Sequence, residues 1–81
     1  MNKDEISANI AAYIKKYRGV SGITQAELAK RTGLTVQRIS AYANGRRMPS
    51  IVNLLKLADA MDIGCNDIIY NGALNVVRRR S

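Results

Sequence analysis

The first apolar residues of the chain recur at the spacing of a helix. Intervals of four, four and three residues separate Ile6, Ile10, Ile14 and Tyr17. Such intervals place side chains along one face of a helix, where they can be buried together. The pattern therefore predicts an amphipathic helix over residues 3–18, followed by a loop over residues 19–22.

A second helix with well-marked ends follows this loop. Thr24 and Glu27 have the Ser/Thr-x-x-Glu spacing of a capping box, in which the threonine hydroxyl accepts a free backbone N–H of the first turn. Gly33 tolerates the positive φ at which a helix commonly ends. These signals predict a helix over about residues 25–32 with a tight turn directly after it.

The next stretch reads as a third helix that crosses the second at a steep angle. Thr35 is a suitable N-cap and Gly45 a terminator, so we expect a helix over about residues 36–44. The small side chain of Ala29 allows close approach of the two helices, and Ile39 fills their shared core. Two helices joined in this way form a helix-turn-helix.

Two more helices complete the pattern. Ser50 is the expected N-cap of the fourth. Its predicted core residues are Ile51, Leu54, Leu55, Leu57, Ala58 and Met61. Residues 62–64 break this helix, and a short fifth helix over about residues 65–71 presents Cys65, Ile68 and Ile69 inward. The expected fold class is all-α with five helices, forming one domain over residues 3–72. Residues 73–81 are a basic tail, read as a dimerisation segment or a linker.

Positive charge is concentrated on the predicted helix-turn-helix. The whole chain carries a net charge of +7. Residues 15–47 contain a single acidic residue, Glu27. Their basic residues are Lys15, Lys16, Arg18, Lys30, Arg31, Arg38, Arg46 and Arg47. A surplus confined to one motif, rather than scattered over the surface, indicates a polyanionic partner.

The composition excludes several classes of protein. With one cysteine and no histidine, the chain offers neither an intrachain disulfide nor a metal cluster. Cys65 reads as a small buried hydrophobe rather than a thiol switch. We see no activated nucleophile or phosphate-cradling glycine loop, so we expect no enzyme activity and no cofactor. The longest apolar run is far short of the roughly 20 residues of a membrane span, and we expect a cytoplasmic, nucleoid-associated protein.

Motifs spread over nearly the whole chain resemble the phage repressor and Cro-type family, also called xenobiotic-response-element-like regulators. The matching positions are Ile23-Thr24-Gln25-x-x-Leu28-Ala29, Gly33-Leu34-Thr35, Ile39-Ser40, Asn44-Gly45-Arg46-x-x-Pro49 and Leu54-x-x-Leu57-Ala58. The resemblance implies a lambda-repressor-like DNA-binding domain whose second and third helices form the helix-turn-helix. One position departs from the pattern, since Ala43 stands where many members have a glutamate.

The N-terminal part of such a third helix enters the major groove. We expect the base-reading residues to be Gln37, Val36, Ala41, Ser40 and Arg38. The amide of Gln37 can pair with adenine through two hydrogen bonds, and Val36 and Ala41 can contact thymine methyl groups. Arg38 can reach a guanine or a phosphate. The alternative for each is an ordinary solvated surface residue.

The expected phosphate contacts flank this helix, and they are Gln25, Thr35, Asn44, Arg46, Arg47 and Arg18. Gln25 stands at a helix N-terminus, where free N–H groups favour an anion. The resemblance assigns the same role to the matching glutamine, and it assigns backbone contacts to the loop after the third helix. Thr35 is primarily a helix cap.

These observations favour a transcriptional regulator that binds specific double-stranded DNA. One reading helix covers only a few base pairs, so a repressor acting as a homodimer on a palindromic operator is the leading hypothesis. The alternative is an antitoxin-type interaction module that also regulates its own promoter. In that case the tail over residues 73–81 would contact a protein partner. Membrane binding has little support, because the basic residues belong to packed helices.

Overall fold

The computed structural model describes residues 2–71, which contain no β-strand. The helices are α1 (Lys3–Ser21), α2 (Gln25–Thr32), α3 (Val36–Ala43), α4 (Ile51–Ala60) and η1 (Asp67–Asn71). The all-α, five-helix prediction is therefore confirmed. The predicted tail over residues 73–81 lies outside the described residues.

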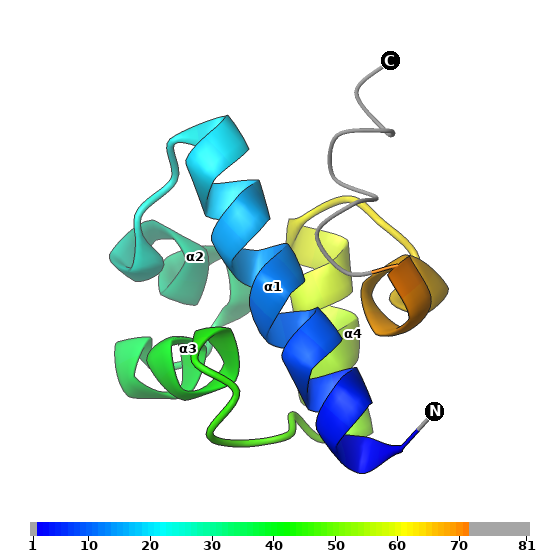
Figure 1. The fold of residues 1–81 in the computed structure, drawn as a ribbon. Helices are drawn as coiled ribbons and strands as arrows, with labels where there is room; N and C mark the ends of the chain where they lie inside the picture. Colours follow the sequence, from blue (N-terminus) through cyan, green and yellow to red (C-terminus); the bar gives the residue numbers. More distant parts are fainter. Residues whose placement is uncertain (1, 72–81) are drawn as a thin grey trace.

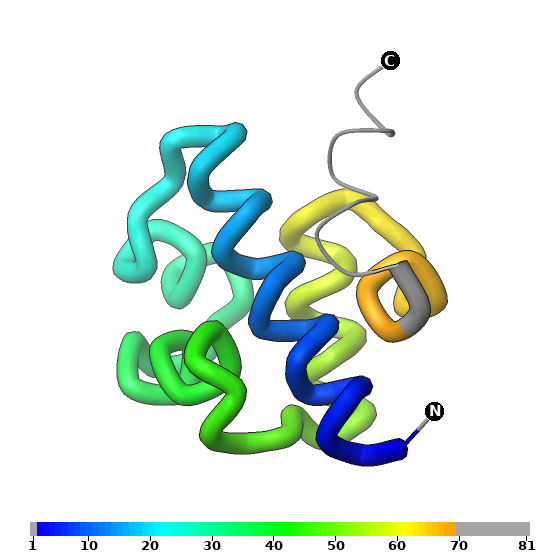
Figure 2. Tube along the Cα trace, in the orientation of Figure 1, coloured from blue at the N-terminus to red at the C-terminus, as the bar shows by residue number. Residues whose placement is uncertain are grey.

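Helix α1 crosses the molecule diagonally, with α2 and α3 on one side and η1 on the other (Figure 1). It contacts α3 and η1, whereas α2 contacts both α3 and α4. The chain trace runs from α2 through a tight turn into α3 and then passes along one edge of the molecule to α4 (Figure 2). This order leaves α2 and α3 together at one side of the bundle.

Helix α1 is longer than the hydrophobic pattern predicts, because it ends at Ser21 instead of residue 18. Gly22, with φ 75°, caps it, and its N–H donates to the carbonyl of Arg18 at 2.8 Å. The hydroxyl of Ser21 donates to the carbonyl of Tyr17 at 2.7 Å and supports the last turn. Gly19 therefore lies within the helix, and the predicted loop over residues 19–22 is wrong for its first three residues.

The core follows the predicted stripe on α1. Ile10 and Ile14 are buried, while Ile6 and Tyr17 pack against the core from half-buried positions. Tyr13 adds a buried ring that the stripe does not include. The other fully buried large side chains are Leu28, Ile39, Leu57 and Ile68, contributed by the four remaining helices. Each helix therefore anchors the shared core.

Helix α4 begins at the predicted cap, since the hydroxyl of Ser50 accepts the N–H of Asn53 at 3.1 Å. Its buried residues are Leu54, Leu57 and Ala58, and Met61 after its end is buried too. The expectation that Ile51 and Leu55 also face the core is wrong, because they are 70% and 54% exposed. At about 100° per residue, Leu55 points more than a quarter-turn away from the buried face, and Ile51 lies at the edge of that face in the first turn.

The chain reverses after α4 at Asp62, which has a positive φ of 56°. Residues 65 and 66 are α-helical, and the fifth helix continues from there as the π-helix η1. Ile68 is buried as predicted, while Ile69 and Cys65 are half-buried against the core. The amide of Asn9 donates to the carbonyl of Ile69 at 2.7 Å and so ties η1 to α1.

Candidate nucleic-acid interface

The turn between α2 and α3 is held by backbone bonds to a single carbonyl. Thr24 caps α2, since its hydroxyl accepts the N–H of Glu27 at 3.0 Å, but only this half of the predicted capping box forms, and the Glu27 carboxylate lies 3.6 Å from Nε of Arg31. Gly33 has φ 75°, and its N–H and that of Leu34 both donate to the carbonyl of Ala29, at 2.9 and 3.1 Å. The left-handed conformation of Gly33 thus makes the bend that the sequence predicts.

Thr32 reinforces this turn in a way that the sequence analysis missed. Its side chain is buried, and its hydroxyl donates toward the carbonyls of Leu28 and Ala29 at 2.9 and 3.1 Å. The same oxygen accepts the N–H of Leu34 at 3.2 Å. One hydroxyl therefore satisfies groups at the end of α2 and in the turn. A buried threonine directly before the turn glycine is the sequence signal that could have found it.

Helix α3 is fixed to the rest of the domain by its inner face. Ile39 is buried, as the sequence predicts, and Tyr42 and Ala43 are buried beside it. Thr35 caps the helix by accepting the N–H of Arg38 at 3.1 Å. The hydroxyl of Tyr42 accepts a hydrogen bond from the amide of Asn53 at 2.9 Å, which joins α3 to α4. The orientation of α3 is therefore set by apolar packing and by one polar contact, both made by its inner face.

The start of α3 presents its side chains to solvent. Val36 is 43% exposed, Gln37 and Arg38 are exposed, and Ser40 is half-buried. Ala41 is only 9% exposed, so the prediction that it lies on the outer face is wrong. Its carbonyl accepts the N–H of Arg46 at 2.9 Å, and this bond, with Gly45 at φ 71°, closes the end of the helix. The accessible reading surface is therefore the first turn of α3 together with Ser40.

Ser40 organises the end of this surface. Its carbonyl accepts the side-chain amide of Asn44 at 2.9 Å, and its hydroxyl oxygen lies 3.4 Å from the same nitrogen. Nη2 of Arg46 donates toward that hydroxyl at 3.5 Å. These contacts hold Asn44 and Arg46, from a loop, against α3. The network depends on the conformation of the loop after α3, so the pattern of residues along the chain does not predict it.

Arg46 and Arg47 are exposed on a loop that is anchored at both ends. Before them, the carbonyl of Gly45 accepts a hydrogen bond from Ser7 of α1 at 3.4 Å. After them, Met48 packs against the core. The loop therefore holds the guanidinium groups of Arg46 and Arg47 at the surface beside α3.

The remaining predicted phosphate contacts lie near the start of α2. Gln25 is the first residue of that helix and is half-buried. Arg18 is half-buried too, and its Nε donates to the carbonyl of Ile23 at 3.2 Å. This bond brings the end of α1 to the segment that caps α2, so Arg18 and Gln25 border the same end of α2.

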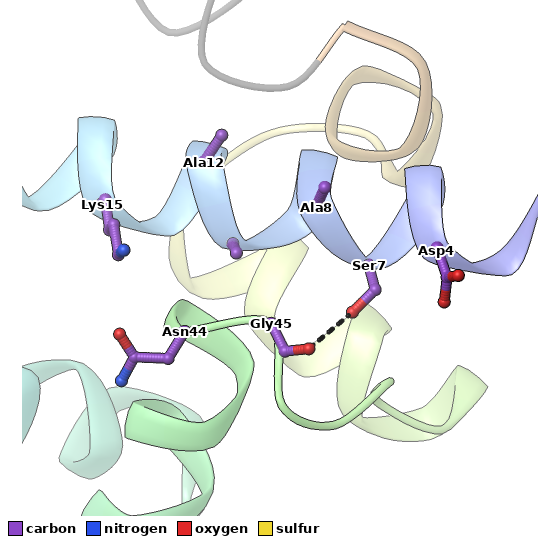
Figure 3. Close-up of a pocket in the computed structure, with 8 residues that line it drawn as sticks. Asp4, Ser7, Ala8, Ala12, Lys15, Asn44 and Gly45 are labelled. Atoms are coloured by element: carbon purple, nitrogen blue, oxygen red, sulfur yellow. Dashed lines mark hydrogen bonds between the residues drawn. The ribbon is translucent and has the colours of Figure 1, made fainter.

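An open groove separates α1 from the turn after α3 (Figure 3). The α1 side of the groove is lined by the small side chains of Ser7, Ala8, Ala11 and Ala12, and Ser7 points toward Gly45 (Figure 3). Lys15 and Asn44 lie at the same end of the groove (Figure 3). Lys15 thus extends the basic surface beside α3, although the sequence analysis counted it only in the charge of the motif.

Other kinds of site are not indicated in the part of the chain that the structure describes. No group of three or more His, Cys, Asp or Glu side chains converges there in a way that could hold a metal ion. None of the helices within residues 2–71 combines the length and the apolar character needed to cross a membrane.

A tight-turned helix pair with an exposed first turn on its second helix, flanked by a basic loop, defines a helix-turn-helix DNA-binding domain. The sequence profile of the helix-turn-helix family matches residues 14–68. The chain therefore belongs to this family, in its Cro/C1-type branch, and the resemblance seen in the sequence is confirmed.

Three curated proteins illustrate the relationship. An uncharacterized HTH-type transcriptional regulator, y4dJ of Sinorhizobium fredii, is 28% identical over 60 residues, covering 74% of this chain and 78% of its own. An uncharacterized HTH-type transcriptional regulator of Methanothermobacter thermautotrophicus is 42% identical over 48 residues, covering 59% and 70%. The cryptic phage CTXphi transcriptional repressor RstR of Vibrio cholerae is 33% identical over 45 residues, covering 56% of this chain but only 40% of its own. Family and relatives together support a DNA-binding transcriptional regulator and not an enzyme.

Proposed function

We propose that the protein is a repressor that binds a palindromic operator as a homodimer, with α3 in the major groove. One observation carries this proposal. The first turn of α3 is exposed at Val36, Gln37 and Arg38, while the opposite face of the same helix is buried. A helix so anchored can insert its free N-terminal turn between the two DNA backbones.

Three side chains of that turn have the chemistry to read bases. Gln37 can pair through its amide with N6 and N7 of adenine. Val36 offers methyl groups to a thymine methyl, and Arg38 offers two donors to guanine or one to a phosphate. Ser40 is the fourth proposed reader, although its hydroxyl also orients Asn44 and Arg46.

The phosphate set surrounds this reading surface on both sides. The proposed contacts are Gln25, Thr35, Asn44, Arg46, Arg47 and Arg18, with Lys15 added from the structure. Five of these seven side chains are exposed, while Gln25 and Arg18 are half-buried near the α2 N-terminus, where free N–H groups favour an anion. Phosphate neutralisation should supply much of the affinity and make it fall with added salt.

The homodimer follows from the small size of a single reading surface. One α3 covers too few base pairs for useful specificity, so two copies on half-sites about one helical turn apart are needed. Repression is inferred from the similarity to RstR, which is named a transcriptional repressor and is 33% identical to this chain over 45 residues. We assign residues 3–72 to the DNA-binding domain, acting at the nucleoid in the cytoplasm.

A selection of bound duplexes from a random pool tests the proposal. We expect a recovered site with two inverted half-sites, bound about a thousandfold more tightly than random duplex. Equal affinity for the selected and random duplexes would remove sequence-specific recognition. A recovered site without inverted symmetry would remove the palindromic operator.

A further inference from the structure

Helix α4 carries a second apolar face that nothing in the described structure covers. Ile51, Val52 and Leu55 are 70%, 58% and 54% exposed, and we refer to these three residues as the α4 outer face. Single exposed apolar residues are ordinary, but here three large ones lie within five consecutive positions of one helix. Leu55 follows Ile51 by four residues and Val52 by three, so it borders both of them on the helix surface.

The opposite face of α4 already supplies the core with Leu54, Leu57 and Ala58. The first half of α4 is therefore apolar on two faces, and burial of both faces is expected to be favourable. The α4 outer face therefore has the character of a contact surface with another macromolecule.

Charge indicates which macromolecule this is. Residues 48–69 hold one basic residue, Lys56, against three aspartates, Asp59, Asp62 and Asp67, whereas residues 15–47 hold eight basic residues against one acid. DNA is a poor occupant of an apolar face on this acidic part of the chain. Two copies that meet there oppose only a small excess of like charge, whereas contact through the basic surface of residues 15–47 would oppose a much larger one.

The position of α4 also suits a dimer on DNA. Ile51 follows Arg47 by only three intervening residues, so the outer face begins close to the loop that is proposed to contact phosphates. The hydrogen bond between Tyr42 and Asn53 couples α4 to α3. A two-fold axis through the α4 outer face would therefore fix the distance between the two copies of α3 and their relative orientation.

We propose that Ile51, Val52 and Leu55 form the symmetric contact between two copies of this chain. This inference rests on the proposed operator-binding homodimer. Three aliphatic side chains cover far less than the roughly 800 Å² per partner of a standard stable interface. The contact is consequently weak in free solution and forms when two copies occupy neighbouring half-sites, where their effective concentration is high.

The test replaces the apolar contact without altering charge. We compare the chain with its Ile51→Gln/Leu55→Gln variant, and use Val20→Gln as the matched control, since Val20 is 41% exposed on α1. Binding is measured on the selected full site and on an isolated half-site. The double variant should retain its half-site affinity within about twofold and lose roughly a hundredfold in the avidity of the full site. The Val20→Gln control should match the original chain on both duplexes, and thermal unfolding should confirm that all three proteins are folded.

A second measurement needs no operator. Methyl resonances of the DNA-free chain are followed by NMR from micromolar to millimolar concentration. Shifts confined to Ile51, Val52 and Leu55, and abolished in the double variant, would support the contact. Full-site binding unaffected by the double substitution, or concentration-dependent shifts on another face, would overturn it. If the original chain bound the selected and random duplexes equally, that result would count against the proposed function alone. The NMR measurement would still show whether the α4 outer face forms the contact between two copies.

Discussion

The side-chain amide of Asn53 donates a hydrogen bond to the buried hydroxyl of Tyr42 at a distance of 2.9 Å. Tyr42 lies on the inner face of α3 and is 2% exposed, while Asn53 lies in the first turn of α4. This bond is the polar link between the proposed reading helix and the helix that carries the proposed dimer contact. It allows α3 to be positioned by a specific partner in addition to apolar packing.

Replacing Tyr42 with Phe removes the hydroxyl and leaves the ring in place. The amide of Asn53 then loses its acceptor in a half-buried position, and we expect the free energy of unfolding to fall by about 1–2 kcal/mol. Urea denaturation measures this loss. A Tyr17→Phe control, on a half-buried tyrosine of α1, should cost less. Equal losses in the two variants would show that the Tyr42 bond contributes nothing specific.

The conformation of Gly33 leads to a second prediction. A Cβ at this position would meet no atom within 4 Å, so a substitution acts only through the left-handed backbone at φ 75°. Gly33→Ala should therefore destabilise the domain by about 1–2 kcal/mol, and Gly33→Asn by less. Gly19 supplies the matched control, because it lies within α1 with equally open space around it. Gly19→Ala should raise the free energy of unfolding by about 0.5–1 kcal/mol. If both alanine variants changed the free energy of unfolding in the same direction, the left-handed conformation of Gly33 would not explain the effect.

The local signals of this sequence predict the fold well. Thr24, Thr35 and Ser50 each accept the N–H three residues ahead, as expected, because a capping bond is made within a single turn. The spacing of Ile10 and Ile14 likewise predicts their burial, since the period of the helix fixes the face they share.

The predictions that were wrong concern the end of α1 and the exposure of Ala41 and Leu55, and they have a different origin. Gly19 and Gly22 can each end a helix, and α1 continues to Ser21, where Tyr17 packs against the core and Arg18 donates to the carbonyl of Ile23. Ala41 is buried outside the stripe that carries Ile39, and Leu55 is exposed because other residues already fill the core. These outcomes depend on contacts between elements, which the pattern of one element does not contain. The proposed contacts with DNA are a further step and stay predictions.

Arg46 tests the electrostatic part of the interface. It is exposed, its Nη2 lies 3.5 Å from Ser40 Oγ, and we propose that it neutralises one phosphate. Arg46→Ala should weaken binding to selected and random duplexes alike and reduce the slope of log affinity against log salt by about 0.9. Fluorescence polarisation at several salt concentrations measures both quantities. Lys56→Ala on α4 is the control, and it should leave the slope unchanged. An unaltered slope for Arg46→Ala would remove this residue from the phosphate set.

Gln37 tests base recognition itself. The side chain is exposed in the first turn of α3, where its removal leaves the core of the domain intact. Gln37→Ala should cost roughly 1–3 kcal/mol on the selected duplex and leave binding to random duplex nearly unchanged, because only the matched site offers an adenine partner. Replacing that adenine in the duplex should reduce the affinity of the original chain and have little further effect on the variant. A loss of the same size on both duplexes would make Gln37 a positioning residue, and the base readout would then have to come from Val36 and Arg38.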